Sequence, residues 1–181
     1  MKKWITLFSQ TGTEIYNLIN LLGKKPDAIL TNRESFDGIN INLLDVAIDR
    51  IYFLQPRPTT DVYNAVLRDI GCVPENTFLT MHGYLRIIPD EICNTYEIYN
   101  LHPAPLRQHP ELKGKDPQKR IASTPYTYYG NTIHKCTSEL DAGEIVCEEF
   151  YPNKNYSHQE IVDLSHSSAT NLWFNFLNHI I

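Results

Sequence analysis

The feature that most constrains the fold is the alternation of short apolar runs with segments of helical period. The strand-like runs occupy residues 4–8, 28–31, 51–54 and 78–80. Between the first two runs, apolar residues recur at the spacing of one helical face, at Ile15, Leu18, Ile19 and Leu22. This alternation over short connections predicts an α/β fold with an open, mostly parallel, Rossmann-like sheet and helices on both faces.

Two helices of this half have recognisable boundaries. Thr11 and Glu14 fit a capping box, so the first helix is expected to begin near Gly12 and to end at Gly23. A second helix is predicted over residues 60–70. Its inward-facing residues are expected to be Val62, Ala65, Val66 and Ile70.

The second half of the chain predicts three further strands and one long helix. The strands are expected at residues 97–101, 132–137 and 144–150, with a tight turn at residues 141–143. Ser157 and Glu160 form another capping box, which opens the final helix. Its apolar face is predicted from Ile161, Leu164, Leu172, Phe176 and Ile180. Residues 1–181 are therefore expected to form one catalytic domain that ends in this helix.

Composition excludes several classes of function. The chain has 21 acidic and 16 basic side chains, a net charge of −5, and no basic cluster, which argues against nucleic acid or membrane partners. The N-terminal apolar run is too short for a signal peptide, so a cytoplasmic protein is expected. The 4 cysteines form no C-x-x-C pair, so free thiols are expected rather than disulfides or a zinc site.

Two groups of polar residues are candidates for catalysis. Asn100 and His102 end a predicted strand two positions apart, so their side chains are expected on one face, where an amide and an imidazole can act on one oxygen. Asp141 lies in a tight turn that follows His134, and a carboxylate beside a histidine can move protons. Taken singly, these patterns are more typical of an ordinary turn entry and an Asp-x-Gly turn.

Taken together, four segments resemble the formyltransferase domain of folate-dependent enzymes, with the glycinamide ribonucleotide formyltransferases nearest in layout. The segments are residues 8–13, 81–89, 99–103 and 134–143. The resemblance implies the formyltransferase fold, N10-formyltetrahydrofolate as co-substrate, no metal, and a small-molecule amine as acceptor. It implies Asn100, His102 and Asp141 as the catalytic set, joined by His134, with Asp141 raising the pKa of a protonated His102.

The resemblance also implies binding residues. The cofactor-binding set is expected to be Leu85, Arg86, Ile87, Ile88, Ser138, Glu139 and Leu140, with Arg57 as an additional residue. Residues 85–89 equally fit a buried strand-to-helix corner. The acceptor's phosphate is expected at Gly12, Thr13 and Glu14, where the Glu14 carboxylate either repels it or folds back to cap its own helix with Thr11.

The acceptor is the least constrained part of the prediction. Residues 103–106 and 113–118 depart from the glycinamide pattern towards the transfer-RNA and amino-sugar branches. Glycinamide ribonucleotide or a related amino-nucleotide is the expected acceptor. A nucleotide-linked amino sugar, hydrolysis of the same donor, and a nucleotide-binding module that lacks G-x-G-x-x-G are the alternatives. The oligomeric state is left open.

Overall fold

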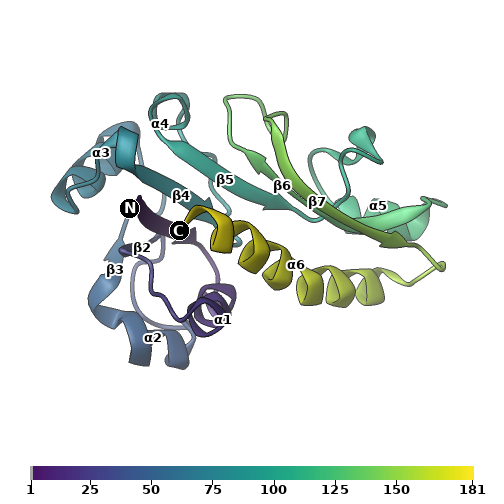
Figure 1. Ribbon diagram of the computed structural model, residues 1–181, viewed down its shortest axis with the longest axis horizontal. Helices are drawn as coiled ribbons and strands as arrows, with labels where there is room; N and C mark the ends of the chain where they lie inside the picture. Colours follow the sequence, from purple (N-terminus) through teal and green to yellow (C-terminus); the bar gives the residue numbers. More distant parts are fainter. Residues whose placement is uncertain (1) are drawn as a thin grey trace. The chain divides into compact units, whose positions relative to one another are not determined.

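The computed structural model describes residues 2–181, and their contacts divide into two compact units. The first contains residues 2–99 with residues 180 and 181, and the second contains residues 100–179. The described strands are hydrogen-bonded in the order β3-β2-β1-β4-β5-β6-β7 (Figure 1). Strand β5, Glu97–His102, contributes residues to both units.

The first unit is built on parallel strands. These are β1 (Lys3–Phe8), β2 (Ala28–Thr31), β3 (Ile51–Phe53) and β4 (Thr77–Met81). Strand β1 pairs in parallel with β2 and β4, and β2 pairs in parallel with β3. Its helices are α1 (Thr13–Leu22), α2 (Ile41–Ala47), α3 (Thr60–Asp69) and α4 (Asp90–Thr95), with short 3-10 turns η1 (Ile48–Arg50) and η2 (Pro74–Asn76).

The direction of the crossovers places helices on both faces of this sheet. The chain moves outward from β1 to β3, then returns to pair β4 on the other side of β1. Because crossovers between parallel strands are right-handed, α1 and α2 cover one face and α3 covers the other. One core cluster accordingly joins Phe8 and Ile29 of the sheet to Ile15 of α1 and Leu43 of α2. The predicted α/β fold is confirmed.

The second unit contains an antiparallel hairpin and the longest helix. Strand β6 (Tyr128–Lys135) pairs with β7 (Ile145–Pro152), with an irregularity between Ile133 and His134. The remaining elements are η3 (Pro110–Leu112), α5 (Pro117–Ser123) and α6 (His158–Ile180). Its core cluster consists of Ala104, Leu106, Leu112, Ile121, Tyr129 and Ile161. Within residues 2–181, no helix combines the length and apolar character needed to cross a membrane.

The two predicted capping boxes have different outcomes. At α6, the Ser157 N–H donates to Glu160 Oε2 at 2.8 Å and the Glu160 N–H donates to Ser157 Oγ at 3.3 Å, so this box is confirmed. At α1 the prediction is wrong. Gly12 is the N-cap residue in the left-handed region, with φ of 73° and no side-chain cap, and Glu14 binds His82 instead of the turn at Thr11.

Predicted helix faces need two corrections. In α3 the buried residues are Tyr63 and Leu67, while the four residues predicted to face inward are only partly buried. The Tyr63 hydroxyl lies 2.6 Å from that of Tyr84, and this bond lets an amphipathic ring occupy the interior. In α6, Trp173 and Leu177 are buried in preference to Phe176. The 7-residue helices α2 and α5 were not predicted, whereas α4 begins directly after Pro89, as the strand-to-helix corner predicted.

Candidate active site

Strand β5 carries the first two candidate catalytic residues. Asn100 is partly buried and His102, the last residue of the strand, is 5% exposed. Successive side chains of a strand alternate between faces, so Asn100 and His102 lie on the same face. The Ala104 N–H donates to the His102 carbonyl at 2.9 Å, which turns the chain sharply after the strand.

Asp141 is held in the turn between β6 and β7. It has φ of 52°, in the left-handed region that aspartate tolerates better than most residues. Gly143 follows because a Cβ there would lie 1.8 Å from the Lys135 carbonyl oxygen. The Lys135 N–H also donates to the Glu144 carbonyl at 2.9 Å, which closes the turn. The sequence Asp-Ala-Gly thus fixes where the carboxylate lies.

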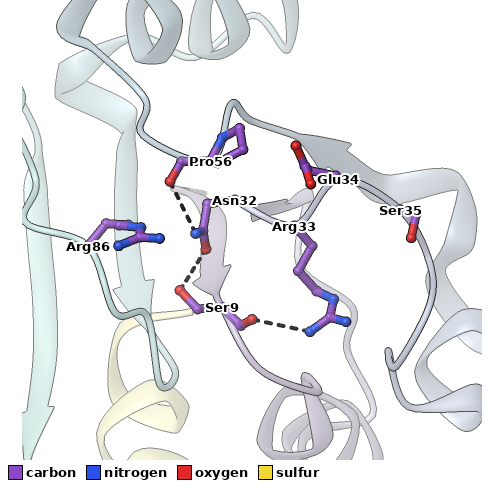
Figure 2. A pocket seen from close by; sticks show the side chains of 7 residues that line it. All are labelled: Ser9, Asn32, Arg33, Glu34, Ser35, Pro56 and Arg86. Atoms are coloured by element: carbon purple, nitrogen blue, oxygen red, sulfur yellow. Dashed lines mark hydrogen bonds between the residues drawn. The ribbon is translucent and has the colours of Figure 1, made fainter.

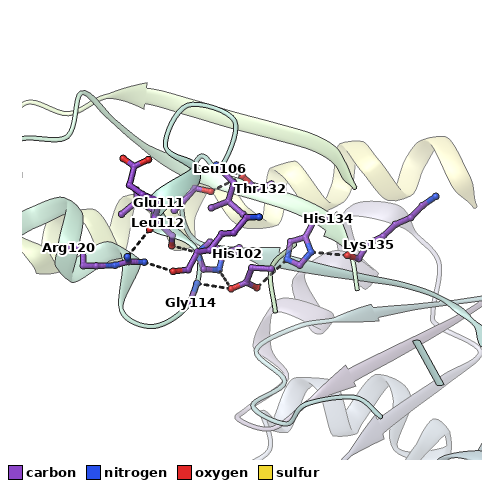
Figure 3. Close-up of polar contacts among 12 residues, drawn as sticks. His102, Leu106, Glu111, Leu112, Gly114, Arg120, Thr132, His134 and Lys135 are labelled. Atoms are coloured by element: carbon purple, nitrogen blue, oxygen red, sulfur yellow. Dashed lines mark hydrogen bonds and ion pairs between the residues drawn. The ribbon is translucent and has the colours of Figure 1, made fainter. Parts of the chain in front are cut away.

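The Asp141 carboxylate faces two histidines and one backbone N–H. Its Oδ2 lies 3.3 Å from His102 Nδ1 and accepts the Gly114 N–H at 3.0 Å. Its Oδ1 lies 3.5 Å from His134 Nε2, an ion-pair distance. Figure 3 shows the two histidines and Gly114 around this position. Of the predicted catalytic residues, the structure therefore brings His102, His134 and Asp141 into one buried cluster.

The far nitrogen of each histidine faces a backbone carbonyl. His102 Nε2 lies 2.9 Å from the Leu112 oxygen, and His134 Nδ1 lies 3.0 Å from the Lys135 oxygen. A carbonyl oxygen only accepts hydrogen bonds, so both of these nitrogens carry a proton. Each imidazole is then oriented with its remaining nitrogen towards the Asp141 carboxylate.

Burial controls the acidity of this cluster. It lowers the pKa of His102 below the ordinary histidine value, although the Asp141 charge and the Leu112 carbonyl act in the opposite direction. Asp141 therefore acts on the His102 pKa in the predicted direction, but burial outweighs it. For Asp141, burial acts to raise the pKa, but the contact from His134, the His102 charge and the Gly114 N–H outweigh it and lower the pKa. Asp141 is ionised at neutral pH.

A polar cleft lies at the carboxyl ends of the strands in the first unit, as expected for an open α/β sheet. Its volume is about 320 Å³, and it is lined by Ser9, Asn32, Arg33, Glu34, Ser35, Pro56 and Arg86 (Figure 2). Ser9 Oγ accepts the Leu85 N–H at 2.8 Å and donates to Asn32 Oδ1 at 2.7 Å. These bonds fix the loops that follow β1, β2 and β4 around the cleft.

The predicted cofactor-binding residues are divided between the units. Leu85 and Ile87 are 65% and 85% exposed, Arg86 lines the cleft and Ile88 is buried. Arg57 is exposed on the loop after β3. In the second unit, the exposed residues 138–140 precede Asp141, and Thr137 Oγ1 donates to the Glu139 carbonyl at 3.0 Å. Leu140 is 65% exposed. Like Leu85 and Ile87 in the first unit, it presents a large apolar side chain to solvent.

The turn before α1 is stabilised by its own contacts. Thr13 Oγ1 lies 2.9 Å from Thr11 Oγ1 and accepts from Asn40 Nδ2 at 2.9 Å. Glu14 Oε2 lies 2.8 Å from Nδ1 of His82, whose side chain is fully buried. The predicted cap between Glu14 and Thr11 is thus replaced by a bond from Glu14 to His82, the residue that follows β4.

Sequence reasoning missed several polar residues that organise the site. His82 was expected only as part of a strand end, because its partner Glu14 is distant in the sequence. The groups around His102 and Asp141 from Leu112, Gly114 and Arg120 were also missed, because backbone contacts of a loop leave no sequence pattern. Within residues 2–181, no group of 3 or more His, Cys, Asp or Glu side chains could hold a metal ion.

Comparison with known proteins defines the class. The model of the formyl transferase family matches residues 72–168, more than half of the chain and the segment that contains the buried cluster. The chain belongs to the formyl transferase family. It is 26% identical over 164 residues to the trifunctional purine biosynthetic protein adenosine-3 of Gallus gallus, covering 84% of this chain but only 16% of that protein.

Solved structures show the same fold. The phosphoribosylglycinamide formyltransferase of Campylobacter jejuni subsp. jejuni NCTC 11168 has a TM-score of 0.80 and 20% identity, over 99% of this chain and 97% of that chain. The phosphoribosylglycinamide formyltransferase of Bacillus halodurans has a TM-score of 0.80 and 18% identity, over 99% and 95%. The predicted family and fold are both confirmed.

Proposed function

We propose that this protein transfers the formyl group of N10-formyltetrahydrofolate to a primary amine of a small molecule in the cytoplasm. Glycinamide ribonucleotide, or a related amino-nucleotide, is the proposed acceptor. The observation that carries the proposal is the His102–Asp141 pair, which is buried within the segment that matches the formyl transferase family. The names of the similar proteins support the acceptor.

The chemistry of formyl transfer fits the residues of the second unit. The formyl donor supplies an activated one-carbon group, and negative charge develops on its carbonyl oxygen as the amine attacks. The Asn100 amide would donate a hydrogen bond to that oxygen, the kind of contact that is stronger in the transition state than before it. As the bond between the formyl carbon and N10 breaks, His102 would supply a proton to N10 of the departing tetrahydrofolate, and the attacking amine would lose one proton. Asp141 would orient the imidazole and stabilise its charged form.

The residues proposed to bind the donor suit its chemistry. Pterins present donors and acceptors along one edge, which backbone groups of residues 85–88 could pair. The exposed side chains of Leu85 and Ile87 supply apolar surface, and the Arg86 guanidinium can bind carboxylates of the donor's glutamyl tail. Gly12 and Thr13 are proposed to contact the acceptor's anionic group at the start of α1.

Binding of the donor can be tested apart from catalysis. A non-hydrolysable 10-formyl folate analogue should raise the melting temperature of the wild-type protein, because a ligand that binds only the folded state stabilises it. Arg86→Gln should weaken this effect, whereas Lys119→Gln, a matched charge removal on α5, should leave it unchanged. A folded protein whose melting temperature does not move at saturating analogue would contradict the proposal.

A further inference from the structure

Arg120 joins helix α5 to the loop that contacts His102. Its Nη1 donates to the Glu111 carbonyl at 2.9 Å and its Nη2 donates to the Lys113 carbonyl at 2.7 Å. Figure 3 shows the Arg120 guanidinium beside Glu111 and Leu112, with dashed lines for its hydrogen bonds to this segment. Because the guanidinium is planar and its donors are fixed, two such bonds set both the distance and the orientation of the loop.

The residues beside these two carbonyls are the ones that contact the buried cluster. Leu112, between Glu111 and Lys113, accepts the bond from His102 Nε2 at 2.9 Å. Gly114, immediately after Lys113, donates its N–H to Asp141 Oδ2 at 3.0 Å. Leu112 is also fully buried, and it packs in the same core cluster as Ile121 of α5. One side chain therefore holds a segment that supplies a partner to both members of the pair.

We propose that Arg120 is a positioning residue, which fixes residues 111–114 so that the Leu112 carbonyl keeps a proton on His102 Nε2 and the Gly114 N–H holds the Asp141 carboxylate. The inference rests on the proposed function only where it links His102 to formyl transfer. Its structural content concerns the tautomer and orientation of one imidazole, which can be observed without any substrate.

Several charged groups act on His102, and the experiment must separate them. Asp141 and the Leu112 carbonyl raise the pKa of His102, whereas burial, His134 and the charge of Arg120 lower it. Removing the guanidinium altogether would change two opposing contributions to the His102 pKa, namely the charge of Arg120, which lowers it, and the Leu112 contact, which raises it. Arg120→Lys keeps the positive charge and loses the paired bonds, because a single ammonium cannot reproduce the planar fork. This variant therefore isolates the contact with the loop.

The decisive measurement is nitrogen NMR of the histidine side chains in the full chain, with His102 assigned by comparison with His102→Gln. In the wild type, neutral His102 should carry its proton on Nε2. In Arg120→Lys the proton should move to Nδ1, facing Asp141. The titration midpoint should fall, because the Leu112 contact that raises the pKa is weakened. Lys119→Gln, on an exposed side chain of the same helix, should show neither change.

Enzyme kinetics provide an independent readout. Arg120→Lys should lower kcat between about tenfold and 100-fold with KM for the donor nearly unchanged, because misplacement of a reacting group affects the chemical step. The proposal is overturned if wild-type His102 carries its proton on Nδ1, or if a folded Arg120→Lys keeps the wild-type tautomer and midpoint. The NMR measurements need no substrate, so they test the role of Arg120 even if the protein transfers no formyl group. A failure of the proposed function can therefore be told apart from a failure of this proposal.

Discussion

Asp141 has the most demanding position of any residue in the candidate site. The residue is 8% exposed, and its carboxylate faces His102, His134 and the Gly114 N–H from three different segments. A buried charge is tolerated only where such partners compensate it. Because the three partners lower its pKa, Asp141 remains charged and can stabilise a proton on His102.

Asp141→Asn should therefore separate charge from shape. The amide keeps the volume of the side chain but removes the charge that raises the His102 pKa, so the basic limb of the pH–rate profile should move to lower pH. Turnover at neutral pH should fall by about 100-fold to 1000-fold, as for loss of a transition-state contact. Glu144→Gln, on an exposed residue that directly follows the same turn, is the control. Formyl transfer by Asp141→Asn near the wild-type rate would exclude the proposed proton transfer.

Glu14 makes a contact that only a long side chain can reach. Its carboxylate bonds to the buried His82, whose other nitrogen lies 2.8 Å from Thr80 Oγ1. Glu14→Asn should reduce the free energy of unfolding by about 1–3 kcal/mol because a buried nitrogen loses its partner, while Glu14→Gln should cost less. Urea denaturation of both variants measures the difference. A wild-type free energy of unfolding in Glu14→Asn would show that the contact with His82 contributes nothing.

The same pair of variants bears on the acceptor. Because His82 binds the Glu14 carboxylate, we expect this charge not to repel an anion held at Gly12 and Thr13. The KM for glycinamide ribonucleotide should then stay within about threefold in Glu14→Gln, since the charge in this position is held away from the ligand. A large gain in activity from a negligible baseline would instead indicate a natural acceptor without a phosphate at this place.

At the scale of elements, the start of α6 shows how local contacts define a helix. The Glu160 carboxylate accepts two hydrogen bonds from Ser157, one from its hydroxyl at 2.7 Å and one from its N–H at 2.8 Å. Ser157→Ala should therefore lower stability by about 1 kcal/mol, the usual cost of losing an N-cap side chain. Thermal melts should show no comparable effect for Ser167→Ala, an exposed residue within the same helix. An unchanged melting temperature in Ser157→Ala would contradict this account of the helix start.

Elements with a strong local period could be predicted from the sequence, and those fixed by distant contacts could not. Strand β2 has the predicted bounds, β5 is one residue longer than predicted, and α1 lies between the predicted limits Gly12 and Gly23. The short helices α2 and α5 have too few turns to show a period. The failed capping box at α1 has a specific cause, because His82 at the end of β4 competes for Glu14.

The candidate site divides in the same way. The positions of His102, His134 and Asp141 followed from motifs at strand ends and a turn, and the structure brings these three together. Their catalytic role stays a prediction. The net direction of the His102 pKa could not be derived from the sequence, because it depends on how much water the fold removes from the ring. The loop that contacts this pair could not be predicted either, because it acts through backbone groups of Leu112 and Gly114, which leave no sequence pattern.

For the molecule as a whole, the lowered pKa values predict loss of stability in acid. As the pH falls below about 6.5, unfolded chains bind a proton at His102 before folded chains do, so the unfolded state gains. Below about pH 4 the same holds for Asp141, whose folded pKa is also lowered. Urea denaturation at pH 7.5 and 5.5 should show the loss, and His102→Asn should reduce the difference between these two values. A wild-type protein that is more stable at pH 5.5 than at pH 7.5 would contradict the lowered His102 pKa.

The central claim is that this chain moves a formyl group to an amine. The most direct measurement follows a carbon-13 formyl label from N10-formyltetrahydrofolate in the presence of glycinamide ribonucleotide. The wild-type protein should place the label on the glycinamide nitrogen as the donor is consumed, and His102→Asn should lose about 100-fold or more of that rate. Label recovered as free formate with no formylated amine would indicate a hydrolase and contradict the account.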